Sequence, residues 1–216
     1  MNPVKIHRIA LGIVNAYLVQ TPEGFVLIDT GYASNRKALE AALTKLGCLN
    51  DQLKLIILTH GDADHIGNAA YIRSITNAPI AMGKGDALMA RSNDESESRK
   101  AKPDHLSLLF TLVKKTGLMN SSSAFEGFEP DLFLEDGQGL VSLGLDATVL
   151  ALPGHTKGSI GILTKEGDLF CGDLMYNLPG FGYIDDAVEH RKSMERVKQL
   201  QPKLIYPGHG KAFVLK

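Results

Sequence analysis

LIILTHGDADHIG, residues 55–67, places four potential metal ligands directly behind a short apolar run. Those ligands are His60, Asp62, Asp64 and His65. A continuous run of leucine and isoleucine this short predicts a strand that is buried on both faces. The ligands would then lie at the carboxyl end of a central strand, where open α/β sheets bind ligands. Two imidazoles and two carboxylates gathered there favour a bound cation over the alternative, a polar turn with incidental histidines.

Composition and charge are those of an ordinary globular chain with one sizeable core. The 216 residues are 44% hydrophobic and 22% charged. The net charge of −1 gives no electrostatic reason to expect nucleic acid or an anionic membrane as a partner. No apolar run reaches transmembrane length, and the first residues lack the apolar region of a signal peptide. Cys48 and Cys171 are too few for a disulfide framework, so we expect a cytoplasmic protein, with a trimmed secretory precursor as the alternative.

The chain repeats one pattern: a hairpin with a Glu-Gly turn and a terminal acid, a helix, a strand, and a loop with a histidine. The matching segments are residues 16–30, 34–46 and 54–61 in the first half and residues 159–173, 185–200 and 203–210 in the second. Turn residues and alternation indicate the hairpins, and Ser34 is the expected N-cap of the first helix. Two such halves, with sheets face to face and helices outside, predict an α/β (α+β) fold. It would be a four-layer αββα sandwich forming one domain over residues 1–216.

The segment that joins the halves is expected to hold a helix over 66–76 and a short strand over 78–82. Residues 91–104 are polar and charged, which predicts an exposed connection. An apolar-rich helix is expected over 104–115, ending near a glycine. Together, residues 83–131 form an insertion that we expect to act as a lid over a small-molecule substrate.

Apolar side chains of this insertion and of the 177–183 loop would lie near the ligand edge. They are Leu106, Leu109, Phe110, Phe181 and Tyr183. Such side chains would line an apolar pocket that suits a lipophilic acyl or lactone substrate. The alternative is that they bury against the sandwich or against a partner subunit, which leaves a homodimer open.

Three further ligands follow strand-like segments in the second half: His155, Asp173 and His209. With the first four, they stand in an order and context that resemble the metallo-β-lactamase-fold superfamily, from about Asn15 to Gly210. The resemblance is carried by LIDTG (27–31), the motif of residues 60–65, PGHTKGS (153–159), Gly172-Asp173 and PGHG (207–210). It points to the superfamily and to no single member, because the fold hosts many chemistries.

The resemblance implies a metallo-β-lactamase-like αββα sandwich with a site for two metals at one edge. The implied sets are His60, Asp62 and His155 for one metal, Asp64, His65 and His209 for the other, and Asp173 as the bridge. A hydroxide between the metals would be the nucleophile. The residue types agree independently, since imidazole and carboxylate suit zinc, iron or manganese. We expect two divalent ions, zinc first, with iron or manganese as alternatives.

Asp62 departs from the family pattern, which is usually His-x-His-x-Asp-His. A carboxylate in place of the second histidine lowers the net charge of the metal cluster. Bound water would then be less acidic, and the first site would favour iron or manganese more than usual. Flavo-diiron proteins of the superfamily also place an acid there, a glutamate. We expect Asp62 to ligate; the alternative is that it does not reach and leaves the first site weak or empty.

Asp64 and Tyr176 are the expected catalytic residues. Asp64 lies within the ligand motif, and Tyr176 stands three residues after Asp173, a spacing similar to that of lactone-hydrolysing members. A phenol there could hydrogen-bond a developing oxyanion or protonate a leaving oxygen; alternatively, the tyrosine only packs in its loop. Asp29 could orient a ligand histidine, but we expect it to cap the turn before Gly31.

The sequence thus predicts a metal-dependent hydrolase in which the metal-bridging hydroxide attacks an ester-like carbonyl of a lactone, thioester or β-lactam. One alternative is an iron-dependent redox enzyme of the same fold that reduces oxygen or oxidises a sulfur substrate. Another is a non-catalytic protein that binds a metal or a ligand, in which Asp62 marks a decayed site.

Overall fold

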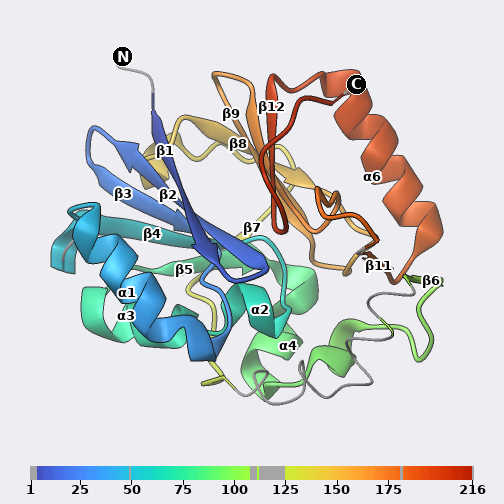
Figure 1. The fold of residues 1–216 in the computed structure, drawn as a ribbon, viewed down its shortest axis with the longest axis horizontal. Helices are drawn as coiled ribbons and strands as arrows, with labels where there is room; N and C mark the ends of the chain where they lie inside the picture. Colours follow the sequence, from blue (N-terminus) through green and yellow to red (C-terminus); the bar gives the residue numbers. More distant parts are fainter. Residues whose placement is uncertain (1–3, 49, 108–110, 112–124, 181, 216) are drawn as a thin grey trace.

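A computed structural model describes residues 4–48, 50–107, 111, 125–180 and 182–215 of the chain. Two sheets lie face to face, and helices cover their outer faces (Figure 1). This arrangement confirms the predicted four-layer αββα sandwich. Over these residues, no helix is long and apolar enough to cross a membrane.

The first sheet has six strands in the order β1-β2-β3-β4-β5-β7. They are β1 (Lys5–Leu11), β2 (Val14–Thr21), β3 (Gly24–Ile28), β4 (Leu53–Leu58), β5 (Ile80–Gly83) and β7 (Leu132–Leu134). The first three pair antiparallel, and the pairing is parallel from β3 onward. The strand β4 therefore lies in the interior of the sheet with its carboxyl end at one edge of the sandwich.

The second sheet has four strands in the order β12-β10-β9-β8. They are β8 (Ala147–Ala151), β9 (Ile160–Thr164), β10 (Asp168–Gly172) and β12 (Leu204–Pro207). A separate small ladder pairs β6 (His105–Leu106) with β11 (Tyr183–Ile184). Each large sheet thus contains the hairpin and the following strand that the internal repeat predicts.

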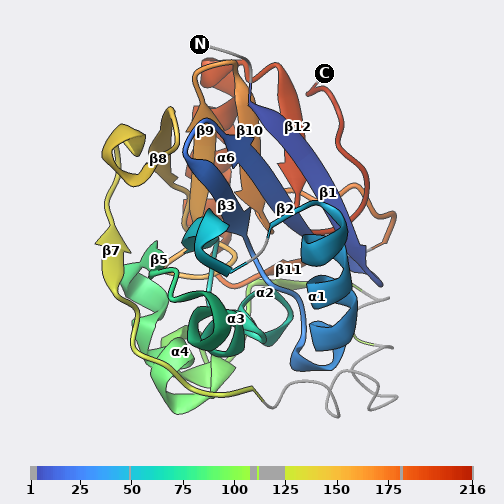
Figure 2. The same cartoon turned by 90° about the vertical axis from the view of Figure 1, so that its left-hand side faces the viewer.

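The helices lie outside the sheets, as Figures 1 and 2 show for α1, α3 and α6. The α-helices of the described residues are α1 (Arg36–Lys45), α2 (Ala63–Ile66), α3 (Ala69–Thr76), α4 (Ala87–Ser92) and α6 (Ala187–Leu200). The helix α1 packs Leu39 on the first sheet, and α6 packs Val197 on the second. Asp186 caps α6 by accepting hydrogen bonds from two backbone N–H groups of its first turn.

The strand β4 explains why the apolar run in the sequence is continuous. Leu55 and Ile57 point into the core between the two sheets, where they join Phe170 of the second sheet. Ile56 and Leu58 point the other way, into the core beneath α1 and α3. Because successive side chains alternate between two buried faces, no polar position is left within the run. The predicted burial on both faces is confirmed.

The helix expected over 66–76 is present as α3 but begins later, at Ala69, because Gly67 and Asn68 separate it from the short helix α2. The Asn68 side chain donates to the carbonyl oxygens of Thr30 (2.8 Å) and Tyr32 (2.7 Å). The asparagine therefore satisfies backbone groups of the loop after β3 at the break in the helix. The preceding helix also starts later than expected: Ser34 lies within a 3-10 turn, and Asn35 is the N-cap of α1.

The prediction of an exposed connection over 91–104 is wrong at its centre. Ser98 is buried and donates to the carbonyl oxygen of Gly85, and the side chain of Arg99 is 11% exposed. The expected helix over 104–115 begins instead as strand β6, and most of its remaining residues lie outside the described ones. Leu109, Phe110 and Phe181 of the expected apolar pocket lie outside them too, so the lid over 83–131 stays a prediction.

Candidate metal centre

The seven predicted ligands come together at the edge of the sandwich where strands of both sheets end. His60 lies in the loop directly behind β4. Asp62 is the N-cap of α2, and Asp64 and His65 lie on this single turn of helix. The other three side chains follow the second sheet: His155 comes after β8, Asp173 after β10 and His209 after β12. Backbone pairing joins the halves here, since Asn15 N–H donates to the carbonyl oxygen of Gly208 (2.8 Å).

His60, Asp62 and His155 form the first ligand group, with one ligand atom of each residue within 4.8 Å of the others. Asp62 Oδ2 lies 3.0 Å from His155 Nε2 and 3.5 Å from His60 Nε2. The carboxylate therefore lies within reach of both histidines, and its ligation of a metal stays a prediction.

Asp64, His65 and His209 form the second group under the same distance limit. Asp64 Oδ2 lies 3.3 Å from His209 Nε2 and 3.9 Å from His65 Nε2. Asp173 stands between the groups: its Oδ1 is 3.3 Å from His65 Nε2, and its Oδ2 is 3.2 Å from His209 Nε2 and 3.9 Å from His155 Nε2. Its place is that of a residue shared by two adjacent sites.

Each of the four histidines turns Nε2 toward the cluster and Nδ1 toward a fixed oxygen. The four pairs are His60 with Thr59 Oγ1 (3.0 Å), His65 with Asp29 Oδ2 (2.8 Å), His155 with the Tyr183 carbonyl oxygen (3.0 Å) and His209 with the Ile13 carbonyl oxygen (2.8 Å). A carbonyl oxygen only accepts, so Nδ1 carries the proton at His155 and His209, which leaves the lone pair of Nε2 for a cation. Four such arrangements are what metal-binding histidines require.

Buried atoms without a hydrogen-bond partner provide an independent test of the fit. Among the described residues, these atoms include His60 Nε2, His65 Nε2 and Asp173 Oδ1, all facing the cluster; the last two lie 3.3 Å apart as an ion pair without forming a well-aligned hydrogen bond. A buried polar atom without a partner is costly, and a divalent cation would satisfy several of them together. The donor set of imidazole nitrogens and carboxylate oxygens suits zinc, iron or manganese. The residues therefore fit a metal centre.

Asp29 does more than cap a turn, contrary to our expectation. Its backbone has φ of 59°, and its carboxylate accepts from Thr59 N–H (2.8 Å) and from the Thr59 hydroxyl. The same carboxylate holds His65 Nδ1. Because Thr59 also contacts His60 Nδ1, Asp29 orients one histidine directly and a second through the threonine.

The charges of the cluster are mutually dependent. Burial lowers the pKa of His65, but the carboxylates of Asp173, Asp29 and Asp64 outweigh it and hold that pKa well above its usual range. At His209, Asp173 and Asp64 outweigh burial and raise the pKa to about 10. Burial also raises the pKa of Asp173, but the two histidines hold it well below its ordinary value. Without metal, protons on the histidines balance the carboxylates.

We expect the metal-free protein to lose stability as the pH rises from about 6.5 to about 10. The pKa of His209 is about 10 in the folded state against an ordinary 6.5. Its protonation therefore stabilises the folded state fully below pH 6.5, and this stabilisation is lost as the pH rises to about 10. The loss should be on the order of 2–5 kcal/mol. Denaturant unfolding of chelator-treated protein at pH 6.5, 8 and 9.5 measures it. Zinc-loaded protein is the control, and a flat or rising stability of the metal-free form would contradict the prediction.

Tyr176 lies at the cluster, as its spacing from Asp173 predicted. Its hydroxyl is 3.1 Å from His155 Nδ1, and its ring centroid is 5.7 Å from that of His209. Burial, followed by the charges of Asp173 and Asp62, holds its pKa well above the ordinary value. The phenol therefore stays protonated near neutral pH and can donate a hydrogen bond.

Sequence reasoning missed two residues that contact the ligand loops. Arg99 forms an ion pair with Asp62 Oδ1, and Asp86 accepts from the backbone N–H groups of Gly61 (2.9 Å) and Gly158 (2.8 Å). Neither belongs to a motif, and Arg99 stands in a charged stretch that resembles a solvated loop. No signal in the single sequence distinguishes them from surface residues.

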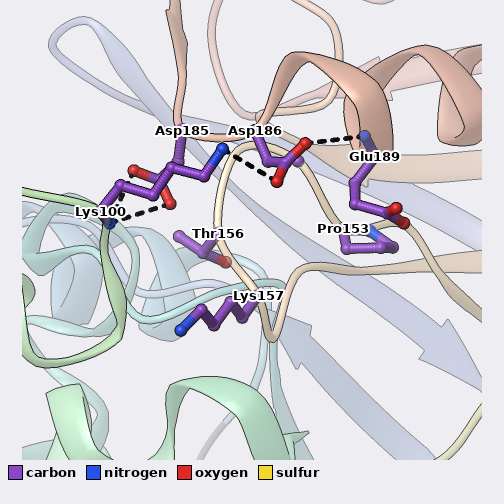
Figure 3. A pocket seen from close by; sticks show the side chains of 8 residues that line it. Lys100, Pro153, Thr156, Lys157, Asp185, Asp186 and Glu189 are labelled. Atoms are coloured by element: carbon purple, nitrogen blue, oxygen red, sulfur yellow. Dashed lines mark hydrogen bonds and ion pairs between the residues drawn. The ribbon is translucent and has the colours of Figure 1, made fainter. Parts of the chain in front are cut away.

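A small pocket flanks the 153–157 loop that carries His155 (Figure 3). There Lys100 N–H donates to the Asp185 carboxylate (3.1 and 3.2 Å), and Lys100 Nζ pairs with Asp186 (2.9 Å). These contacts fasten the segment after Arg99 to the start of α6.

A four-layer αββα sandwich with a cluster of histidine and aspartate side chains at one edge is typical of metallo-β-lactamase-like proteins. The family model of the metallo-beta-lactamase superfamily matches residues 9–209, and the chain belongs to this superfamily. The match includes all seven predicted ligands, and the fold of this superfamily binds divalent metals.

Relatives differ in name and length. The chain is 26% identical over 197 residues to the Caenorhabditis elegans beta-lactamase-like protein 2 homolog; the match covers 91% of this chain and 55% of that protein. It is 28% identical over 193 residues to hydroxyacylglutathione hydrolase GloC of Haemophilus influenzae, covering 85% and 79%. The structure resembles TTHA1623, crystallised in a di-iron-bound form, with 27% identity, a TM-score of 0.68 and coverage of 96% and 94%. The chain thus spans little more than half of the C. elegans relative.

Proposed function

We propose that this protein is a hydrolase with two divalent metal ions that cleaves an ester-like bond in a small molecule: a lactone, thioester or β-lactam. The observation that carries the proposal is the cluster of four histidines and three aspartates, in which every Nε2 faces inward. Zinc is the first candidate, with iron or manganese as alternatives.

The two ligand groups would hold the ions, and Asp173 would contact both. Bound ions would activate a water molecule and polarise the carbonyl of the substrate. Asp64 stays ionised, because His65 and His209 outweigh burial and lower its pKa, so it can serve as a ligand and accept a hydrogen bond from the attacking water. Tyr176, a protonated phenol beside His155, would donate to the developing oxyanion or the leaving oxygen.

The ester-like class is supported by charge and by one relative. Arg99, the arginine that contacts the cluster among the described residues, is paired with Asp62 and is not available to clamp a phosphate. GloC, 28% identical, is named a hydrolase of hydroxyacylglutathione, a thioester. Both observations favour a neutral acyl carbonyl over a phosphodiester as the reacting group.

An iron-dependent redox enzyme is the second candidate, and one observation favours it. TTHA1623, with 27% identity and 94% of its chain covered, was crystallised with two irons. Asp62 adds a hard carboxylate ligand of the kind that iron accepts well. This candidate keeps the same ligand residues and differs in the reaction.

The proposed function is tested with protein loaded separately with zinc, iron or manganese, after elemental analysis confirms two ions per chain. Each form is assayed against activated esters, lactones, S-acylglutathione thioesters and β-lactams. We expect turnover of at least one class, abolished by a chelator and restored by metal. Loaded protein that is inert across the panel would refute the proposal; if the iron form is also coloured and consumes oxygen, the redox candidate replaces it.

Replacing Tyr176 by phenylalanine is expected to lower kcat by about 10²–10³-fold, because one hydrogen-bond donor to the transition state is lost. KM and metal content should change little, since the phenol lies beside the proposed ligands and is not one of them. Steady-state kinetics on the best substrate measure the effect. Tyr71→Phe is the matched control, because Tyr71 hydrogen-bonds Glu40, away from the cluster. An unchanged kcat would show that Tyr176 only packs.

A further inference from the structure

Arg99 is a buried cation with three partners around the first ligand group. Its Nη2 donates to Asp62 Oδ1, and its Nη1 donates to the carbonyl oxygen of His155 (3.3 Å). Its guanidinium carbon lies 4.2 Å from the ring centroid of Tyr183, whose carbonyl oxygen holds His155 Nδ1. Arg99 therefore contacts one proposed ligand directly and a second through its backbone.

The ion pair with Arg99 gives the two carboxylate oxygens of Asp62 different partners. Oδ1 is occupied by Arg99, while Oδ2 faces the Nε2 atoms of His155 (3.0 Å) and His60 (3.5 Å). An unpaired carboxylate could rotate and present either oxygen or both to a cation. Because the planar guanidinium of Arg99 holds Oδ1, only Oδ2 is left for a cation. Asp62 then offers a single ligand atom, as an imidazole would.

The ion pair also neutralises the negative charge that Asp62 brings to the first ligand group. Aspartate in place of a neutral histidine adds one negative charge to the ligand group, and Arg99 adds one positive charge next to it. The Asp62–Arg99 pair is therefore neutral as a unit, like the histidine that usually stands in this position. Both groups are largely buried, with side-chain exposures of 13% and 11%, so water screens their attraction weakly.

The position of Arg99 is fixed from both sides along the chain. Ser98 Oγ donates to the carbonyl oxygen of Gly85 (2.9 Å) on one side. Lys100 pairs with Asp185 and Asp186 on the other, as Figure 3 shows. The side chain thus enters the site from an anchored segment, and little rotamer entropy remains to be lost when a ligand binds.

We propose that Arg99 is a positioning residue that, together with Asp62, replaces the missing histidine of the first metal site by holding Asp62 as a neutralised, single-oxygen ligand. The inference rests on the metal binding in the proposed function. It does not depend on the reaction, so a protein that binds two zinc ions but hydrolyses nothing would refute the function and leave this assignment standing.

The test is a zinc titration of metal-free Arg99→Met protein against a chromophoric chelator, without substrate. We expect the affinity of the first site to fall about 10–100-fold, as for other residues that orient a ligand, while the second site keeps its affinity. A parallel titration of His155→Ala protein shows which of the two zinc-binding steps belongs to the first site, because His155 is a proposed ligand of that site only. Arg91→Met is the matched control, because Arg91 pairs with Glu129 at the surface.

Rescue separates positioning from a merely structural role. Asp62→His combined with Arg99→Met should restore first-site affinity, since a neutral imidazole needs no counter-charge. The first-site affinity of Arg99→Lys should lie between those of wild type and Arg99→Met, because the ammonium group keeps the positive charge but lacks the planar, two-pronged geometry of the guanidinium. Unchanged or tighter zinc binding in Arg99→Met would overturn the proposal, and tighter binding would show that the guanidinium blocks the site. Failure of the rescue, or equal weakening of both sites, would overturn it as well.

Discussion

Asp86→Ala is expected to lower the free energy of unfolding by about 3–5 kcal/mol, a large share of the stability of a domain this size. The buried carboxylate of Asp86 accepts from Gly61 N–H (2.9 Å), Gly158 N–H (2.8 Å) and the Thr156 hydroxyl (2.6 Å). Alanine would leave the two backbone N–H groups without an acceptor, each at a cost of about 1–3 kcal/mol before relaxation. The Thr156 hydroxyl would keep only its hydrogen bond with Ser159 Oγ (2.6 Å). Denaturant unfolding of the metal-free protein measures the loss.

The same substitution should weaken the first metal site, because Gly61 and Thr156 adjoin Asp62 and His155. Asp86→Asn is the matched control: the amide keeps the shape and one acceptor oxygen, so it should cost less than alanine. Burial raises the pKa of Asp86 despite its hydrogen bonds, which means that the charge itself is disfavoured there. A loss under 1 kcal/mol in Asp86→Ala would contradict the role assigned to these hydrogen bonds.

Asp173→Ala is expected to abolish paired metal binding and to lower hydrolysis by about 10³-fold or more. The carboxylate contacts His65, His209 and His155, so its removal takes a shared ligand from both proposed sites. Metal ions contribute several kcal/mol of transition-state stabilisation, and each 1.36 kcal/mol corresponds to about a tenfold change in rate. Elemental analysis should find at most one tightly held ion per chain.

Asp168→Ala is the control for that experiment, because Asp168 begins the same strand β10 and lies outside the cluster. It should retain two ions and full turnover. Near-wild-type activity in Asp173→Ala would refute its shared position in the proposed centre.

The framework of the site could be predicted because it depends on local periodicity and on repetition. The apolar run of β4, the two hairpins and the histidines after strands are all visible in short windows of sequence. Once two halves are known to face each other, strands that end in ligands must converge at one edge. Asp62 could be placed by its position in the motif behind β4, and Tyr176 by a spacing similar to that of lactone-hydrolysing members.

The rest depends on contacts between segments far apart in sequence. The break between α2 and α3 follows from Asn68 bonding residues about 36 positions earlier, and no helix propensity reveals that. Arg99 is paired with Asp62 across 37 positions, and Asp86 reaches Gly158 across 72. Charged residues are usually solvated, so the burial of these two becomes visible only in the folded chain.

The proposed metal ligands come from both halves of the chain, so bound ions would connect the two halves. His60 to His65 belong to the first sheet's loop, while His155, Asp173 and His209 belong to the second. Ions shared among them would join the halves as a removable cross-link that exists only in the folded state. At free metal a thousandfold above Kd, this adds roughly 4 kcal/mol of stability per ion. The concentration of available metal would then set how well the protein resists unfolding and proteolysis. When metal is scarce, the amount of folded protein would fall.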